Sequence, residues 1–185
     1  MRKIVLLLLF GVLSSPLFAQ GIGFRDDDGT TLSIGTNYRI TRSSGDYSTG
    51  VSLAVGINRL TNIQTFLMGI YFETCGKMFC QKHSRAVLKT FSGSIVTVEQ
   101  CIDSYKVQEN REAVGGYDSN IFSLKPCYII QESDLNTLMN EGIKVLRIET
   151  SKGLMDFTYK SDVLGAYLKS EYKLLLEKRD FESNF

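Results

Sequence analysis

The sequence is poor in the residues and motifs that mark most enzymes. Its 185 residues include one histidine and two prolines, and the formal net charge is +1. General acid–base catalysis by an imidazole would depend on His83 alone, and His83 follows a predicted turn. The chain has no G-x-S-x-G nucleophile elbow, no H-E-x-x-H zinc motif, no phosphate-binding loop and no dinucleotide fingerprint. The sequence therefore favours a non-catalytic protein, and it indicates no catalytic residue and no cofactor.

Excess charge of either sign is also missing. A nearly balanced chain gives no electrostatic footprint for nucleic acid or for an anionic membrane surface. Internal repeats, low-complexity blocks and a proline-rich linker are absent from the sequence as well. We expect one domain over residues 20–185, because a chain of this length can form a single core without help.

The first 19 residues have the layout of a secretory signal peptide. Arg2 and Lys3 precede an apolar run over residues 4–13, and a short stretch then leads to Ala19. This run is too short to cross a bilayer as a helix of the mature protein, and cleavage is expected near Ala19–Gln20. We therefore predict a secreted, periplasmic or cell-envelope location and no transmembrane helix in the mature chain. Removal of Arg2 and Lys3 would change the formal net charge to −1.

Period-two alternation predicts several half-buried strands. Residues 31–40 and 51–57 alternate between apolar and polar side chains, and residues 43–50 between them are rich in serine and glycine. We expect these two runs to form one hairpin. Residues 85–91 and 94–100 predict a second hairpin, whereas residues 65–73 are apolar on both faces, as in a central strand.

The second half of the chain also contains a helical pattern. Residues 133–141 begin with Ser-Asp and end before Gly142, which predicts one short helix. Residues 143–150 and 154–160 predict strands, and residues 162–178 predict an amphipathic helix. The expected fold is therefore α+β, a mostly antiparallel sheet with a short helix near 133–141 and a C-terminal helix near 162–178.

One stretch of the sequence resembles a known group of proteins. Residues 128–150, YIIQESDLNTLMNEGIKVLRIET, carry the pattern DL..L...GIKxLRIET, and residues 86–99 precede them as a hairpin. This pattern resembles the C-terminal part of uncharacterised secreted proteins from Gram-negative anaerobes. The resemblance implies a strand, a helix, a strand and export, and it implies no catalytic residue.

The four cysteines are candidates for disulfide bonds. Cys75, Cys80, Cys101 and Cys127 belong to a chain that we expect in an oxidising compartment, and four cysteines allow three connectivities. We favour the pairs Cys75–Cys80 and Cys101–Cys127. Unpaired buried thiols and a metal site are the alternatives, since Cys75, Cys80 and His83 have a C-x4-C-x2-H spacing. That spacing is wider than the usual zinc hook, and we therefore assign no metal site.

The candidate binding segment is the polar stretch 103–120. It is long for a connection, contains Gly115-Gly116 as a hinge, and is expected to form a loop. The residue types suited to adaptable contacts in this loop are Tyr105, Arg111, Tyr117 and Asp118.

Together these features favour an exported, non-catalytic binding or cell-envelope interaction module. Its partner, a protein or an envelope glycan, and its oligomeric state are not specified by the sequence. The alternative is an exported hydrolase that uses paired carboxylates, for example on glycans. A small outer-membrane barrel is a further alternative, which the charged end KRDFESNF opposes.

Overall fold

The computed structural model describes residues 22–43, 47–74, 78–101, 108–114 and 117–183. In these residues twelve strands form one antiparallel sheet, in the order β1-β2-β4-β5-β10-β7-β6-β11-β12. Strand β3 also pairs with β4, and β8 pairs with β9, which pairs with β5. The strands are β1 (Ile22–Asp27), β2 (Thr31–Thr36), β3 (Arg39–Arg42), β4 (Ser48–Asn58), β5 (Gln64–Thr74), β6 (Arg85–Thr90), β7 (Ile95–Gln100), β8 (Gln108–Val114), β9 (Tyr117–Leu124), β10 (Cys127–Ile130), β11 (Ile143–Thr150) and β12 (Gly153–Thr158).

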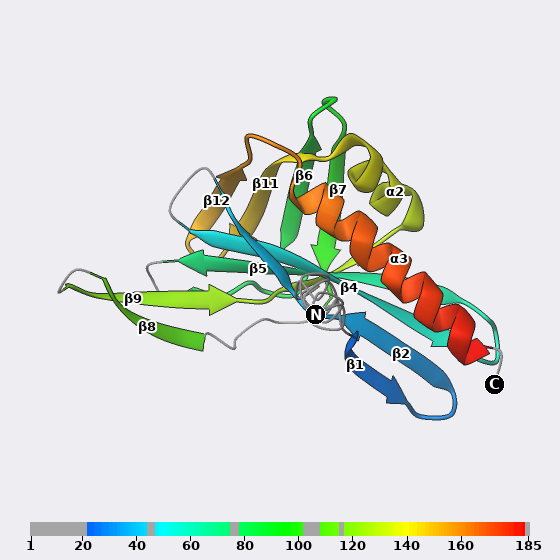
Figure 1. Ribbon diagram of the computed structural model, residues 1–185. Helices are drawn as coiled ribbons and strands as arrows, with labels where there is room; N and C mark the ends of the chain where they lie inside the picture. Colours follow the sequence, from blue (N-terminus) through cyan, green and yellow to red (C-terminus); the bar gives the residue numbers. More distant parts are fainter. Residues whose placement is uncertain (1–21, 44–46, 75–77, 102–107, 115–116, 184–185) are drawn as a thin grey trace, which may run out of the picture.

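Two helices, α2 (Glu132–Glu141) and α3 (Leu164–Ser183), cover one face of this sheet (Figure 1). The sheet also curls, so that β12 at one end approaches β4 and β5. Phe72 of β5 packs against Phe157 of β12 with ring centroids 5.8 Å apart, and the Tyr159 hydroxyl donates to Thr49 Oγ1 at 2.8 Å. The core therefore lies between the curled sheet and the helices. The predicted α+β class is confirmed.

Local sequence accounts for most of these elements. Val51, Leu53 and Val55 of β4 are all buried, as the alternation predicts. Between β10 and β11 the chain forms the expected strand, short helix and strand. Helix α2 ends at Gly142, whose positive φ of 69° suits glycine and whose N–H donates to the Leu138 carbonyl at 3.1 Å. The start differs slightly, because the N-cap is Gln131 and its side chain makes no capping hydrogen bond.

The single strand expected over residues 31–40 is wrong. The chain breaks at residues 37–38 into β2 and β3, and both pair with β4. Leu32 and Ile34 face the core, but the break shifts the alternation by one residue, and Ile40 is 50% exposed. Arg39 points to the helices instead, where its Nη1 donates to Ser170 Oγ at 2.6 Å. Alternation alone could not reveal this shift, because the residues on both sides of the break keep the same sequence pattern.

The loop expected over residues 103–120 is also wrong in its greater part. Strands β8 and β9 form a hairpin, in which Gln108 lies opposite Ser123 and Val114 lies opposite Tyr117. Figure 1 shows this hairpin reaching beyond the rest of the sheet. The sequence QENREAV of β8 has little apolar alternation, so the strand depends on pairing with β9 rather than on burial of one face.

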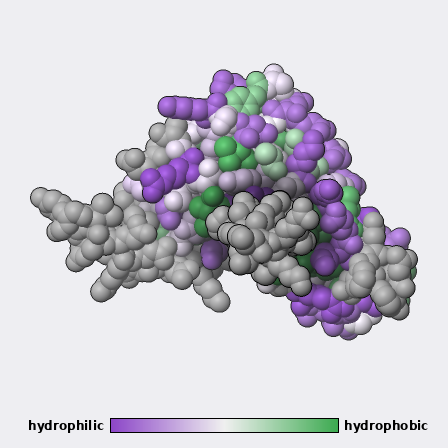
Figure 2. Space-filling model, viewed as in Figure 1, coloured by the Kyte–Doolittle hydropathy of each residue, from purple (hydrophilic) through white to green (hydrophobic). Residues whose placement is uncertain are grey.

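The exterior is mainly polar on the side seen in Figure 2, where small hydrophobic areas lie between hydrophilic side chains. In the part of the chain that the structure describes, no helix has the length and apolar character to cross a membrane.

Candidate functional site

The face of the sheet opposite the helices has two different halves. On β2 and β4, and at Gly69 of β5, the residues that alternate with the core residues are small and uncharged, and we call these positions the neutral half; β5 also carries Leu67, Tyr71 and Glu73 on this face. On β6, β7, β11 and β12 these positions include charged residues of both signs beside uncharged ones such as Ile95 and Leu154, and we call the charged positions the charged half. The neutral half consists of Ser33, Gly35, Gly50, Ser52, Ala54, Gly56 and Gly69, and the charged half of Arg85, Lys89, Glu99, Arg147, Glu149 and Asp156.

At one place the chain itself covers the neutral half. The ring of Tyr38 lies over Gly69, where a Cβ atom would come within 2.6 Å of the Tyr38 hydroxyl and 2.4 Å of Ser52 Oγ. The Tyr38 side chain hydrogen-bonds with Ser52, and Lys125 Nζ lies 5.6 Å from the centroid of its ring. Burial raises the pKa of the Tyr38 hydroxyl, which stays a neutral hydrogen-bonding group at physiological pH.

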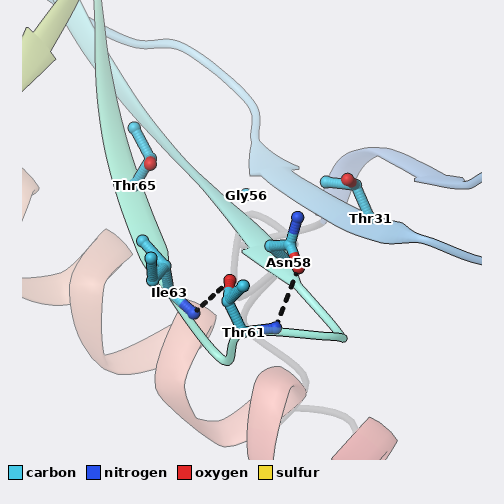
Figure 3. Close-up of a pocket in the computed structure, with 6 residues that line it drawn as sticks. All are labelled: Thr31, Gly56, Asn58, Thr61, Ile63 and Thr65. Carbon is cyan, nitrogen blue, oxygen red and sulfur yellow. Dashed lines mark hydrogen bonds between the residues drawn. The ribbon is translucent and has the colours of Figure 1, made fainter.

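At another place the neutral half is open. A cavity of about 380 Å³ lies beside the turn that joins β4 to β5. Figure 3 shows that its walls come from β2, β4, β5 and this turn. The lining residues are Thr31, Gly56, Asn58, Thr61, Ile63 and Thr65.

The cavity is electrically neutral. Its lining contains hydroxyls, one amide and one aliphatic side chain, with no carboxylate. The nearby Asp27 is engaged by two arginines, since its Oδ2 lies 2.5 Å from Arg59 Nη2 and 3.4 Å from Arg25 Nη2. This cavity therefore lacks the pair of facing carboxyl groups that the hydrolase alternative requires.

Three of the predicted contact residues lie on the β8–β9 hairpin. Arg111 of β8 is opposite Asn120, and Tyr117 and Asp118 begin β9 opposite Val114 and Ala113. Tyr105 lies outside the described residues. The hairpin joins the sheet at the C-terminal end of β5, where Thr74 lies opposite Phe122. The cavity is at the other end of β5, at Thr65, about 30 Å away at the usual rise of an extended strand.

The structure brings two of the four cysteines together. Cys101 follows β7 and lies opposite Cys127 of β10, as the register of Gln100 with Tyr128 requires. The Cys101 N–H donates to the Cys127 carbonyl at 3.0 Å, and the Cys101 thiol donates to the same carbonyl at 3.2 Å. Both side chains carry free thiols in this structure. Burial and the neighbouring Cys101 raise the pKa of the Cys127 thiol to about 12.

Cys80 and His83, the described members of the alternative metal group, lie in different surroundings. Cys80 is fully buried in the core, and burial raises the pKa of its thiol to about 12. His83 is exposed and pairs with Glu99 of β7. Cys75 lies outside the described residues, so the predicted Cys75–Cys80 bridge stays a prediction. Among the residues that the structure describes, no three metal-binding side chains form a group that could hold an ion.

The cavity is not apparent from sequence patterns. Its polar residues belong to three strands and a turn. They are separated along the sequence and become neighbours only when the sheet forms. One signal is present, because glycine at position 56 alternates with Val55 and Ile57 and so leaves an open spot on the opposite face.

Comparison with known proteins adds no further residue to this site. No protein-family model matches the chain, and neither a curated protein nor a solved structure matches it significantly.

Proposed function

We propose that this protein is an exported, non-catalytic binding module of the cell envelope, and that the β8–β9 hairpin is its contact surface. The observation that carries the proposal is the position of the hairpin. Beyond the three residue pairs of β9 with β5, the strands β8 and β9 pair only with each other in the described part of the chain. A two-stranded ribbon of this kind is marginally stable in water, and a partner that adds contacts would stabilise it.

In the described part of the chain, one edge of β8 pairs with no other strand, and this edge offers a specific way to bind. An edge strand presents unpaired N–H and C=O groups, and an extended partner segment can add to it as a further strand. The residues of β8 are mainly polar and include Glu109, Arg111 and Glu112, which favours a polar partner over an apolar one.

A shortened hairpin tests this function. Replacing residues 111–120 by an Asn-Gly turn joins Asn110 to Ile121, which are already cross-strand partners. We expect this variant to lose cosedimentation with isolated Gram-negative cell envelopes and to keep the thermal midpoint of the parent. Arg147→Ala, on the charged half, is the control and should still cosediment. Equal cosedimentation of the shortened variant and the parent would contradict the proposed contact surface.

Export is tested separately. The residues that support it are the leader of Arg2, Lys3 and the apolar run that follows. Cell fractionation followed by mass measurement should find a protein that begins near Gln20 outside the cytoplasm. A full-length chain in the cytoplasm would contradict export and leave the hairpin experiment unaffected.

We also propose that Cys101 and Cys127 form a disulfide in the exported protein. Cys101 directly follows β7, lies opposite Cys127 of β10 and donates its N–H to the Cys127 carbonyl at 3.0 Å. Opposed, hydrogen-bonded residues of antiparallel strands have a usual Cα separation of about 5.5 Å, which falls within the range of disulfides. The reaction is thiol–disulfide exchange with an oxidised dithiol oxidase, in which two thiols become one disulfide and the oxidase disulfide becomes two thiols. In the chain-entropy model this bridge contributes about 3.5 kcal/mol.

Mass spectrometry under non-reducing conditions checks the bridge. The protein purified from the exported fraction and unfolded in urea should resist alkylation at Cys101 and Cys127, and it should take up two labels there after reduction. Under the same unfolding conditions, the variant Cys101→Ser should leave Cys127 open to alkylation without reduction. Alkylation of both thiols in the unreduced parent protein would contradict the bridge.

A further inference from the structure

The cavity beside the β4–β5 turn is separate from the hairpin and has the construction of a small binding site. Glycine at position 56 creates its floor, because a Cβ atom there would meet no atom closer than Ser33 Oγ at 3.9 Å. The volume of about 380 Å³ is within the range of small-molecule sites.

The wall of the cavity is held by the turn itself. Asn58 Oδ1 accepts hydrogen bonds from the N–H groups of Leu60 and Thr61, both at 3.0 Å, and Thr61 Oγ1 accepts from the Ile63 N–H at 3.4 Å (Figure 3). The Asn58 oxygen is therefore used within the turn, and the amide nitrogen is the group that Asn58 offers to a ligand. The hydroxyls of Thr31 and Thr65 can each donate and accept.

Charge selects the class of ligand. The lining is neutral, and charged side chains of the neighbouring segments have other partners. Asp27 pairs with Arg59, and Arg179 donates to Gln64 Oε1 at 3.1 Å. Asp28 is also engaged, because it accepts from the N–H groups of Thr30 and Thr31 at 2.8 and 2.6 Å. An anionic ligand would find no cationic group in the lining, and a metal ion would find no carboxylate there.

The rim supplies an apolar contact. Ile63 of the lining is 63% exposed, and Leu60 of the same turn is 84% exposed, although both are large aliphatic residues. A neutral ligand with many hydroxyls and a C–H face would use both parts of the site, the hydroxyl and amide groups inside and the aliphatic rim. We propose that this cavity binds a neutral saccharide unit through Thr31, Asn58 and Thr65, with its ring against Ile63.

Binding of neutral oligosaccharides tests the proposal. The probes are oligomers of glucose, galactose, mannose and N-acetylglucosamine, and ligand-observed NMR with the mature protein measures their affinity. Asn58→Asp keeps the acceptor of the turn but replaces the donor nitrogen by a charged acceptor, and we expect about tenfold weaker binding. Gly56→Leu places a bulky side chain on the floor of the cavity, and we expect it to abolish binding.

Two control variants show whether binding depends on this cavity. Ala54→Leu adds the same side chain on the same face of β4, one pleat away from the cavity, and should bind like the parent. The hairpin-shortened variant should also keep saccharide binding. The hairpin proposal and the saccharide proposal can therefore fail independently of each other.

The outcomes that overturn the proposal are specific. Absence of binding for every neutral probe would exclude the saccharide site. Unchanged binding by Gly56→Leu would place the sugar elsewhere, and Asn58→Asp decides the same point if Gly56→Leu does not fold. Tighter binding of acidic oligosaccharides, such as oligogalacturonate, would contradict a neutral ligand.

Discussion

The charged and the neutral halves of the sheet face opposite the helices differ in the size of their side chains. In the charged half, side chains reach into water and pair across strands, as Arg147 of β11 does with Asp156 of β12 at 2.6 and 2.7 Å. In the neutral half, small residues let other groups approach the backbone closely. The comparison shows that absence of a side chain is itself a structural feature here.

Three glycines of the neutral half show how this space is used. At Gly50 it is filled by the backbone of β3, at Gly69 by the ring of Tyr38, and at Gly56 it is open. A methyl group at each position should therefore have a graded effect, which tests the comparison directly.

The largest effect is expected from Gly50→Ala. The added Cβ would lie 2.6 Å from the Arg39 carbonyl oxygen and 3.1 Å from Ile40 Cα, and backbone atoms can move only if β3 separates from β4. We expect the free energy of unfolding to fall by about 2–3 kcal/mol, as for an overpacked interior. Urea unfolding followed by circular dichroism measures it, and an unchanged midpoint would contradict the close approach of β3.

A smaller effect is expected from Gly69→Ala. The new methyl group meets the ends of two side chains, Tyr38 and Ser52, which can move at a lower cost than backbone. We expect a loss of about 1–2 kcal/mol. In a Tyr38→Ala background the same substitution should cost less, and a double-mutant cycle would show this coupling; additive effects would mean that Tyr38 does not fill the space over Gly69.

A still smaller effect, with a distinct dependence on pH, is expected from the Arg147–Asp156 pair. The hydrogen bond from Arg147 holds the pKa of Asp156 below its usual value in the folded protein. The stabilisation is therefore present above the usual aspartate pKa of 3.8 and is lost as the pH falls through the lower value of the folded state.

The variant Asp156→Asn should remove this dependence. Unfolding curves of the parent and the variant should converge as the pH is lowered below 3.8, and added salt should reduce their difference at neutral pH. A difference that persists in acid would mean that Asp156 acts through packing rather than charge.

The smallest effect is expected from Gly56→Ala. The added methyl group enters open space, and alanine also restricts the unfolded chain, so stability should rise slightly, by about 0.5 kcal/mol. A loss as large as that of Gly69→Ala would mean that the cavity is not open as the structure shows it.

Sequence patterns predict the strands of the charged half more accurately than those of the neutral half. They predict the hairpin β6–β7 of the charged half nearly to its bounds, because each strand alternates strictly and the turn contains Gly93, whose φ is 104°. In the neutral half they predict β4 and β5, but not the division of residues 31–40 into two strands. Sequence patterns also predict the candidate sites unequally. Composition points to the hairpin residues Arg111, Tyr117 and Asp118, whereas no local pattern points to the cavity.

The sequence by itself determined most of the core residues and most of the regular elements, apart from the break between β2 and β3 and the β8–β9 hairpin, because alternation, helical spacing and turn residues are local properties of the chain. It also placed the four cysteines but not their neighbours. Only the tertiary structure decided that Cys101 faces Cys127, that Tyr38 lies over Gly69 and that the space at Gly56 is open. These three facts depend on the register of strands far apart in the sequence, and register is set by the packing of the whole sheet.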